Sequence, residues 1–157
     1  MTLEGSKVKK VDTNGGVMVE FPFETVSKNG VDWDVTMKVT MDDGDHFMRK
    51  FLEIEVSDKE KAAIDYIDLE SLNVNANDTV WTHPIMGEGV GGMSGYVISL
   101  GQPVYIQGMF LGCEFPMTET EIDSNKNAHM RYFSGKTFEK LQEDNQLTTD
   151  GKYVTWQ

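Results

Sequence analysis

The feature that most constrains the fold is an uninterrupted alternation of apolar and polar residues in VDWDVTMKVTM, from Val31 to Met41. Side chains of a β-strand point to its two faces in turn, so a period of two predicts a half-buried strand with one face in the core. The acidic turn DDGD, Asp42–Asp45, follows directly, and His46–Val56 then restores β-type residues. We expect a long antiparallel hairpin. The apolar residues that should share a face of its second strand are Met48, Leu52, Ile54 and Val56.

Further strand-like segments are separated by turn residues along the whole chain. Val17–Phe23 predicts a short strand in which Pro22 favours an edge or a bulge, because proline donates no ladder hydrogen bond. Ala63–Val74 lacks clean alternation, which is typical of a strand covered on both faces or carrying a bulge. Only Thr137–Asn145 suggests a short helix, and no residue caps it convincingly. The remaining strand-like segments are Tyr96–Leu100, Pro103–Phe115, His129–Phe133 and the C-terminal GKYVTWQ.

About eight short strands without strand–helix alternation predict an all-β fold, an antiparallel β-sandwich with at most one short helix. A length of 157 residues is that of one domain, so we expect a single sandwich domain over residues 1–157. The C-terminal strand pattern runs to Gln157, which suggests that the chain is a fragment of a longer protein. No leader-like segment opens the sequence. The compartment is therefore unknown, with a secreted or cell-surface parent as one possibility.

The composition excludes several classes of partner and site. Twenty-six acidic against fourteen basic side chains give a net charge of −12. Such a field repels phosphate backbones and anionic lipids, so nucleic acid and membranes are not expected partners. The single cysteine, Cys113, excludes an internal disulfide and a cysteine-based zinc cluster. Without a visible electropositive neighbourhood, Cys113 is expected to pack as a small apolar residue.

Three stretches together resemble a known family. MRKFLEIEV with IDYIDLESLNV, then GQPVYIQGMFLGCEFP, then MRYFSGKTF follow one another between Met48 and Phe138. In this order they resemble the β-supersandwich domain, akin to galactose mutarotase, that precedes the catalytic barrel in α-galactosidase-like glycoside hydrolases. The resemblance implies a non-catalytic module that supports or covers the active site of a C-terminal catalytic domain in the same parent chain. The catalytic carboxylates of such enzymes reside in the barrel, so no residue here inherits a catalytic role.

Four residues are the candidates for carbohydrate binding. Proteins that bind sugars use aromatic rings for the apolar faces of pyranoses, and carboxylates, amides and histidines for the hydroxyls. Trp81, His83 and Glu88 lie in or beside a glycine-rich segment that has little core of its own to hold an indole. Glu114 sits among apolar residues, where a carboxylate is costly unless it is paired. Either Arg49 or Arg131 would satisfy it, or it faces the substrate of a neighbouring domain. Trp33, in contrast, is expected in the core.

Other motifs carry weaker signals. The carboxylates of Asp42–Asp45 could bind Ca²⁺, but they lack the alternating ligands of an EF-hand, so a solvated turn is favoured and no cofactor is expected. The three histidines, His46, His83 and His129, have no zinc-ligand spacing. Ser94 lacks one of the glycines of a nucleophile elbow.

Three hypotheses of function follow. The first is the non-catalytic glycosidase module already described, and the second is an autonomous carbohydrate-binding module that recognises a poly- or oligosaccharide. The third is a mutarotase-like enzyme, which would need a histidine and a carboxylate as acid and base, for example His83 or His129 with Glu114. The segment Gly101–Pro116 is expected to be one core strand, part of the scaffold first, whose far end at Glu114 looks toward the space where the substrate of another domain would lie.

Overall fold

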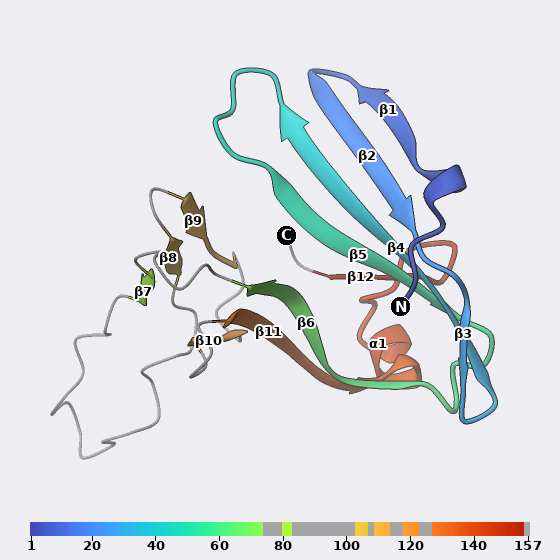
Figure 1. Ribbon diagram of the computed structural model, residues 1–157. Coiled ribbons are helices and arrows are strands. Elements are labelled where there is room, and N and C mark those ends of the chain that lie inside the picture. Colours follow the sequence, from blue (N-terminus) through green and yellow to red (C-terminus); the bar gives the residue numbers. More distant parts are fainter. Residues whose placement is uncertain (74–79, 83–102, 107–108, 114–117, 123–126, 156–157) are drawn as a thin grey trace, which may run out of the picture. The chain divides into compact units, whose positions relative to one another are not determined.

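The computed structural model describes residues 1–73, 80–82, 103–106, 109–113, 118–122 and 127–155, with only the backbone for 80–82, 104 and 120–122. Contacts divide the chain into two compact units (Figure 1). Unit 1 comprises Met1–Ile64 and Lys136–Gln157, and unit 2 comprises Asp65–Gly135. Strands in antiparallel sheets dominate the described residues, which contain one short α-helix, so the predicted all-β antiparallel class is confirmed. The single domain expected over residues 1–157 stays a prediction.

The elements of unit 1 form one large sheet and the helix. The strand order is β1-β2-β4-β5-β12. The short strand β3 pairs with the first residues of β4, and β2 pairs with the rest of β4. The elements are the 3₁₀ turn η1 (Gly5–Lys7), β1 (Lys9–Thr13), β2 (Gly16–Pro22), β3 (Val26–Lys28), β4 (Val31–Asp42), β5 (Arg49–Val56), α1 (Phe138–Glu143) and β12 (Tyr153–Val154).

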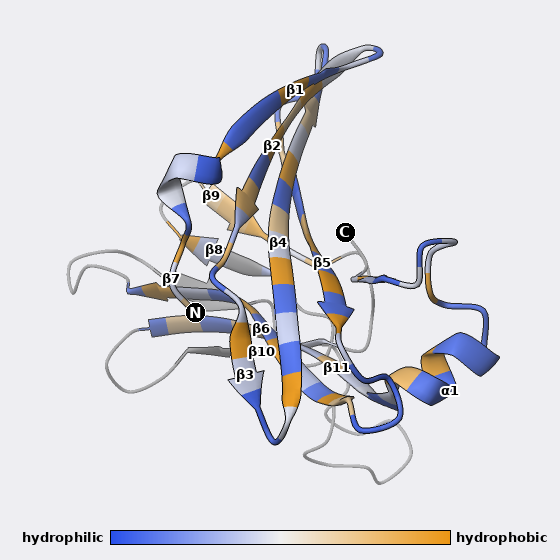
Figure 2. Ribbon diagram, turned by 90° about the vertical axis from the view of Figure 1, so that its right-hand side faces the viewer, coloured by the Kyte–Doolittle hydropathy of each residue, from blue (hydrophilic) through white to orange (hydrophobic). Residues whose placement is uncertain are grey.

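The predicted hairpin of β4 and β5 is confirmed, with a register that runs from Trp33 opposite Val56 to Thr40 opposite Arg49. Figure 2 shows the alternating hydropathy of β4 as bands along the strand. Val31, Val35, Ile54 and Val56 are buried, as the sequence predicts. Met48 is a correction, because it precedes β5 and is 71% exposed instead of sharing the buried face. The hairpin loop is longer than DDGD, since the pairing of β4 with β5 stops at Thr40 and Arg49.

The expected edge or bulge position of Val17–Phe23 is wrong. The strand β2 lies between β1 and β4, and Pro22 is its last residue. Proline is tolerated there because β1 pairs only as far as Glu20, so no ladder hydrogen bond from Pro22 to β1 is required. The carbonyl oxygen of Pro22 instead accepts a hydrogen bond from the N–H of Glu4, at 2.9 Å.

The core of unit 1 is centred on the helix. Phe138 of α1 is fully buried, and its ring meets Trp33 and Tyr153 edge-on, with centroids 5.9 and 6.3 Å apart. Trp33, expected in the core, packs on this ring but is only half-buried. The helix also has the cap that the sequence did not reveal: Thr137 Oγ1 accepts a hydrogen bond from the N–H of Lys140 at 3.1 Å. Asn145 then ends the helix region with a positive φ of 54°, a conformation that asparagine tolerates.

A row of alternating charges crosses the polar face of the unit 1 sheet. Glu20 lies between Lys9 and Lys38, at 2.7 and 3.5 Å, and Glu53 lies between Lys38 and Lys152, at 2.8 and 3.0 Å. We call these five residues the charge row. The row runs across β1, β2, β4 and β5 to the residue before β12. Opposite charges on neighbouring strands stabilise a sheet, so the row is expected to help hold these strands together.

Unit 2 is built from two three-stranded sheets. One has the order β10-β11-β6 and the other β7-β8-β9. The small cluster of Ile106 and Ala128, with Leu72 and Leu111 against it, brings β8 and β9 of one sheet onto β6 and β11 of the other. The strands are β6 (Ala63–Asn73), β7 (Val80–Thr82), β8 (Val104–Ile106), β9 (Met109–Leu111), β10 (Thr118–Ile122) and β11 (Asn127–Thr137).

The segment Gly101–Pro116 is not one core strand. Its described residues form two antiparallel strands, with Ile106 opposite Met109 and Val104 opposite Leu111, so the chain reverses between β8 and β9. Cys113, just past β9, is half-buried. In β6 the alternation of exposure is interrupted: Asp65 and Tyr66 are both exposed after the buried Ile64. These exposed residues show that β6 is not covered on both faces, and the bulge offered as the alternative stays a prediction.

Candidate functional site

The candidate site is a row of three aromatic positions across the sheet β7-β8-β9. Trp81 lies opposite Tyr105, and Tyr105 lies opposite Phe110. Each of the three residues is the middle one of a three-residue strand, VWT, VYI or MFL, in which aromatic, β-branched and other apolar residues favour the extended backbone. We call Trp81, Tyr105 and Phe110 the aromatic row.

The described rings of the row lie on the outer face of this sheet. Ile106 is only 7% exposed and packs toward Ala128, so the neighbouring Tyr105 points to the opposite side of β8. Phe110 is 60% exposed, and its ring centroid lies 6.0 Å from that of Tyr105 with an angle of 42° between the planes. A large aromatic ring that is held by a cross-strand neighbour and still exposed is a ready surface for an apolar ligand face.

Gly112 helps to set the position of the Phe110 ring. A Cβ atom at Gly112 would lie 3.0 and 3.1 Å from two atoms of that ring, closer than ordinary van der Waals contact, and 3.8 Å from Pro103. The ring therefore rests over the backbone of Gly112, where any larger residue would push it away. Gly112 is a positioning residue of the aromatic row.

The residues predicted from sequence are placed only in part. Trp81 lies in β7, where its backbone is described. His83, Glu88 and Glu114 lie outside the described residues. Along the chain His83 directly follows β7 and Glu114 comes three residues after β9, so both adjoin strands that carry the aromatic row.

The arginines expected to satisfy Glu114 have other partners among the described residues. Arg131 Nε donates a hydrogen bond to Asp68 Oδ1 at 2.8 Å, and Arg49 Nη1 lies 3.4 Å from Asp45 Oδ2. Tyr105 and Phe110 are candidate site residues that the sequence interpretation missed. The signal that could have found them is the pair Tyr105 and Phe110 flanking Gln-Gly, a turn-like dipeptide inside the supposed single strand.

The metal and acid/base candidates of the sequence are described only in part. Within them, no three His, Cys, Asp or Glu side chains gather as a metal site requires. In the turn Asp42–Asp45, Gly44 adopts a positive φ of 90° and the Asp45 N–H donates to the Asp42 carbonyl at 3.1 Å, which describes an ordinary tight turn. His129 lies in β11, while its proposed partner Glu114 lies outside the described residues.

Comparisons with models of protein families, with curated proteins and with solved structures find no match to this chain. The likeness to galactose mutarotase-like domains therefore stays a prediction from the sequence. Among the described residues, no helix has the length and apolar character to cross a bilayer.

Proposed function

We propose that this chain is a non-catalytic carbohydrate-binding module that recognises an oligo- or polysaccharide through the aromatic row. The observation that carries the proposal is the exposed ring of Phe110, held against Tyr105 at 6.0 Å in a register that continues to Trp81. Pyranose rings have flat faces of C–H groups, and a line of aromatic positions on a sheet offers these faces a matching surface.

The polar residues that neighbour the aromatic row in sequence would make the binding selective for particular sugars. A stacked ring alone selects poorly between sugars, because hydroxyl groups are read by hydrogen bonds. His83 and Glu114 adjoin β7 and β9 in the sequence, and Glu88 lies in the glycine-rich segment after β7. We therefore assign them the role of contacting hydroxyls, as the sequence interpretation expected.

The proposal extends to the parent protein: the chain would be one module of a larger carbohydrate-active enzyme. It is supported by the resemblance of Met48–Phe138 to the sandwich domain of α-galactosidase-like hydrolases. In that case the aromatic row would hold a glycan near a C-terminal catalytic domain of the parent chain. We assign no catalytic step to the residues of this chain.

The test is isothermal titration of the intact chain with a panel of soluble oligosaccharides and polysaccharides. We expect at least one glycan to bind, and Phe110→Ala, Tyr105→Ala and Trp81→Ala each to weaken binding about tenfold, a loss of roughly 1.4 kcal/mol. Gly112→Val should weaken it as well, because its side chain displaces the Phe110 ring.

The matched control is Phe47→Ala. Phe47 is also a large exposed ring, at 47% exposure, but it lies in the β4–β5 loop of unit 1. Binding by this variant should equal that of the natural chain. The proposal fails if the folded chain binds no glycan in a broad panel, or if Phe110→Ala binds as tightly as Phe47→Ala.

A further inference from the structure

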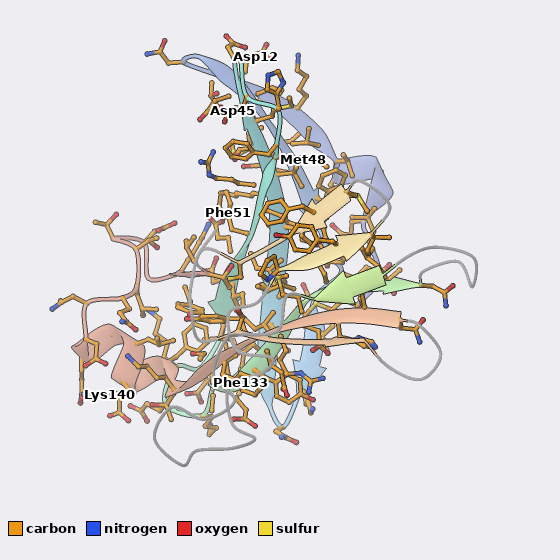
Figure 3. All side chains as sticks on the ribbon, turned by 90° about the vertical axis from the view of Figure 1, so that its left-hand side faces the viewer. Asp12, Asp45, Met48, Phe51, Phe133 and Lys140 are labelled. Carbon is orange, nitrogen blue, oxygen red and sulfur yellow. The ribbon has the colours of Figure 1, made fainter. Side chains whose placement is uncertain are left out.

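The second sheet of unit 2 has an outer face of different chemistry. On β11 the buried residues Ala128, Met130 and Tyr132 alternate with Arg131 and Phe133, so the latter two point away from the inner face. Glu119 of β10 pairs with Arg131 in register, and β6 contributes Tyr66 and Asp68. We call Tyr66, Asp68, Glu119, Arg131 and Phe133 the outer cluster; Figure 3 labels Phe133 within it.

The outer cluster already holds one guanidinium group. Arg131 Cζ lies 4.2 Å from the centre of the Tyr66 ring, and Arg131 Nε lies 2.8 Å from Asp68 Oδ1. A ring combined with a carboxylate is a favourable environment for arginine, because the ring attracts the cation and the carboxylate accepts its hydrogen bond. The cluster thus shows which charged group this face accommodates.

Ring surface and negative charge remain after Arg131 is accounted for. Tyr66 is 47% exposed, and the Phe133 ring lies 6.2 Å from it. Arg131 is a single positive charge between two carboxylates, because Asp68 forms its ion pair and Glu119 lies opposite it on β10. A second ring and a second carboxylate are therefore present for a second cation.

The net charge of unit 2 also favours a cationic ligand. Residues 65–135 contain nine acidic side chains but only two basic ones, Lys126 and Arg131, which gives a net charge of −7. A field of this sign attracts cationic groups and accelerates their association, and it disfavours anionic ligands.

We propose that the outer cluster is a docking surface for a basic, arginine-containing segment of a partner protein. An arginine of the partner would lie against Phe133 and Tyr66 and pair with Glu119, which repeats the environment of Arg131 with a second ring and carboxylate. This site is separate from the aromatic row, since it lies on the other sheet of unit 2 and takes a ligand of opposite character: a charged peptide and not a neutral glycan.

The test is fluorescence anisotropy of the intact chain with a fluorescein-labelled twelve-residue peptide of alternating arginine and serine. We expect binding at about 50 mM NaCl that weakens roughly tenfold at about 300 mM, because salt screens exposed charges. Glu119→Gln and Tyr66→Ala should each weaken binding about fivefold at low salt. A peptide with glutamine in place of arginine should not bind.

The control must separate this site from the overall negative charge. Glu139→Gln removes one carboxylate from the exposed surface of α1, so it changes the net charge by the same amount as Glu119→Gln. We expect less than a twofold effect from it. Equal weakening by the two glutamine variants would overturn the proposal, as would no binding at low salt; the circular dichroism of each variant establishes that it is folded.

Discussion

At the scale of single residues, Gly16 is where the backbone leaves no room for a side chain. It begins β2 opposite Asp42, and a Cβ atom there would lie 2.5 Å from the Met41 carbonyl oxygen and 2.8 Å from Asp42 Cα. Both are backbone atoms of β4, so neither can move aside as a flexible side chain would. The close approach also brings the turn after β1 next to the turn after β4, where the Asp43 N–H donates to the Gly15 carbonyl at 2.7 Å.

Replacing Gly16 by alanine should therefore destabilise the protein. Forcing a methyl group into filled space typically costs about 1–3 kcal/mol, and we expect a loss in this range from the free energy of unfolding measured in urea. Gly5→Ala is the matched control, since a Cβ at Gly5 meets no atom within 4 Å. Equal unfolding midpoints for the two variants would contradict the close approach of β2 and β4.

At the scale of elements, the short helix depends on its first turn. Thr137 caps α1 by accepting a hydrogen bond from the Lys140 N–H, and the helix has only six residues. Removing the side-chain oxygen leaves a helix N–H without its partner.

Thr137→Ala should reduce the free energy of unfolding by about 1 kcal/mol, in the range of 0.5–2 kcal/mol found for such caps. Thr137→Ser keeps the hydroxyl and should retain most of the stability. Thermal unfolding followed by circular dichroism measures both variants. If serine is as destabilising as alanine, the methyl group of Thr137 matters and the capping hydrogen bond does not.

The charge row of the large sheet should make stability depend on pH. Hydrogen bonding to Lys9 lowers the pKa of Glu20 below its ordinary 4.5, with Lys38 adding to the effect and burial opposing it. For Glu53, burial raises the pKa, but hydrogen bonds and attraction from Lys38 and Lys152 outweigh it, so the net pKa is lowered. A carboxyl whose pKa is lower in the folded state stabilises that state above its unfolded pKa, and the contribution is lost as pH falls through the folded pKa.

Glu53→Gln should accordingly be destabilising at pH 7, and its penalty should shrink between about pH 5 and pH 3. Urea unfolding of both proteins across this range gives the difference at each pH. Glu139→Gln, at an exposed position of α1, is the control and should show a small, constant difference. A penalty for Glu53→Gln that stays the same from pH 7 to pH 3 would show that the charges of the row do not contribute.

The elements that the sequence could predict are those with one buried face. The alternation in Val31–Met41 predicts β4 because Val31 and Val35 lie in the core, and Ile54 and Val56 mark the end of β5 in the same way. At the other end of β4 the alternation continues although Met41 is 42% exposed. β1 and β3 could not be predicted in this way: KKVDT and VSK are mostly polar and are held by backbone pairing to β2 and β4. Such pairing leaves little trace in the residue types of short strands.

The candidate site illustrates the same limit. Trp81 could be singled out by its sequence surroundings, but its alignment with Tyr105 and Phe110 depends on strand register, which joins residues far apart in the chain. The reversal between β8 and β9 was also missed because an apolar run continues on both sides of the Gln-Gly dipeptide. The aromatic row is thus a product of pairing and not of local pattern.

At the scale of the whole molecule, the two units raise the question of cooperativity. The length of the chain predicts one domain, whereas its contacts form two compact groups. Each unit has its own buried residues, such as Phe138 and Leu141 in unit 1 and Ala128 and Met130 in unit 2. Compact groups of this kind can open separately if most of their stability comes from contacts within them.

Phe138→Ala tests this separation, because Phe138 packs on Trp33 and Tyr153, both in unit 1. The lost packing should cost about 3–5 kcal/mol. In hydrogen exchange followed by mass spectrometry, we expect faster exchange in β4, β5 and β12, while the unit 2 residues 128–132 of β11 exchange as before. Phe138→Leu leaves a smaller cavity and should produce the same pattern at lower amplitude if the alanine variant does not fold. Equal acceleration in both units would instead show that the chain unfolds as the single domain its length predicts, with the two units held in one cooperative transition.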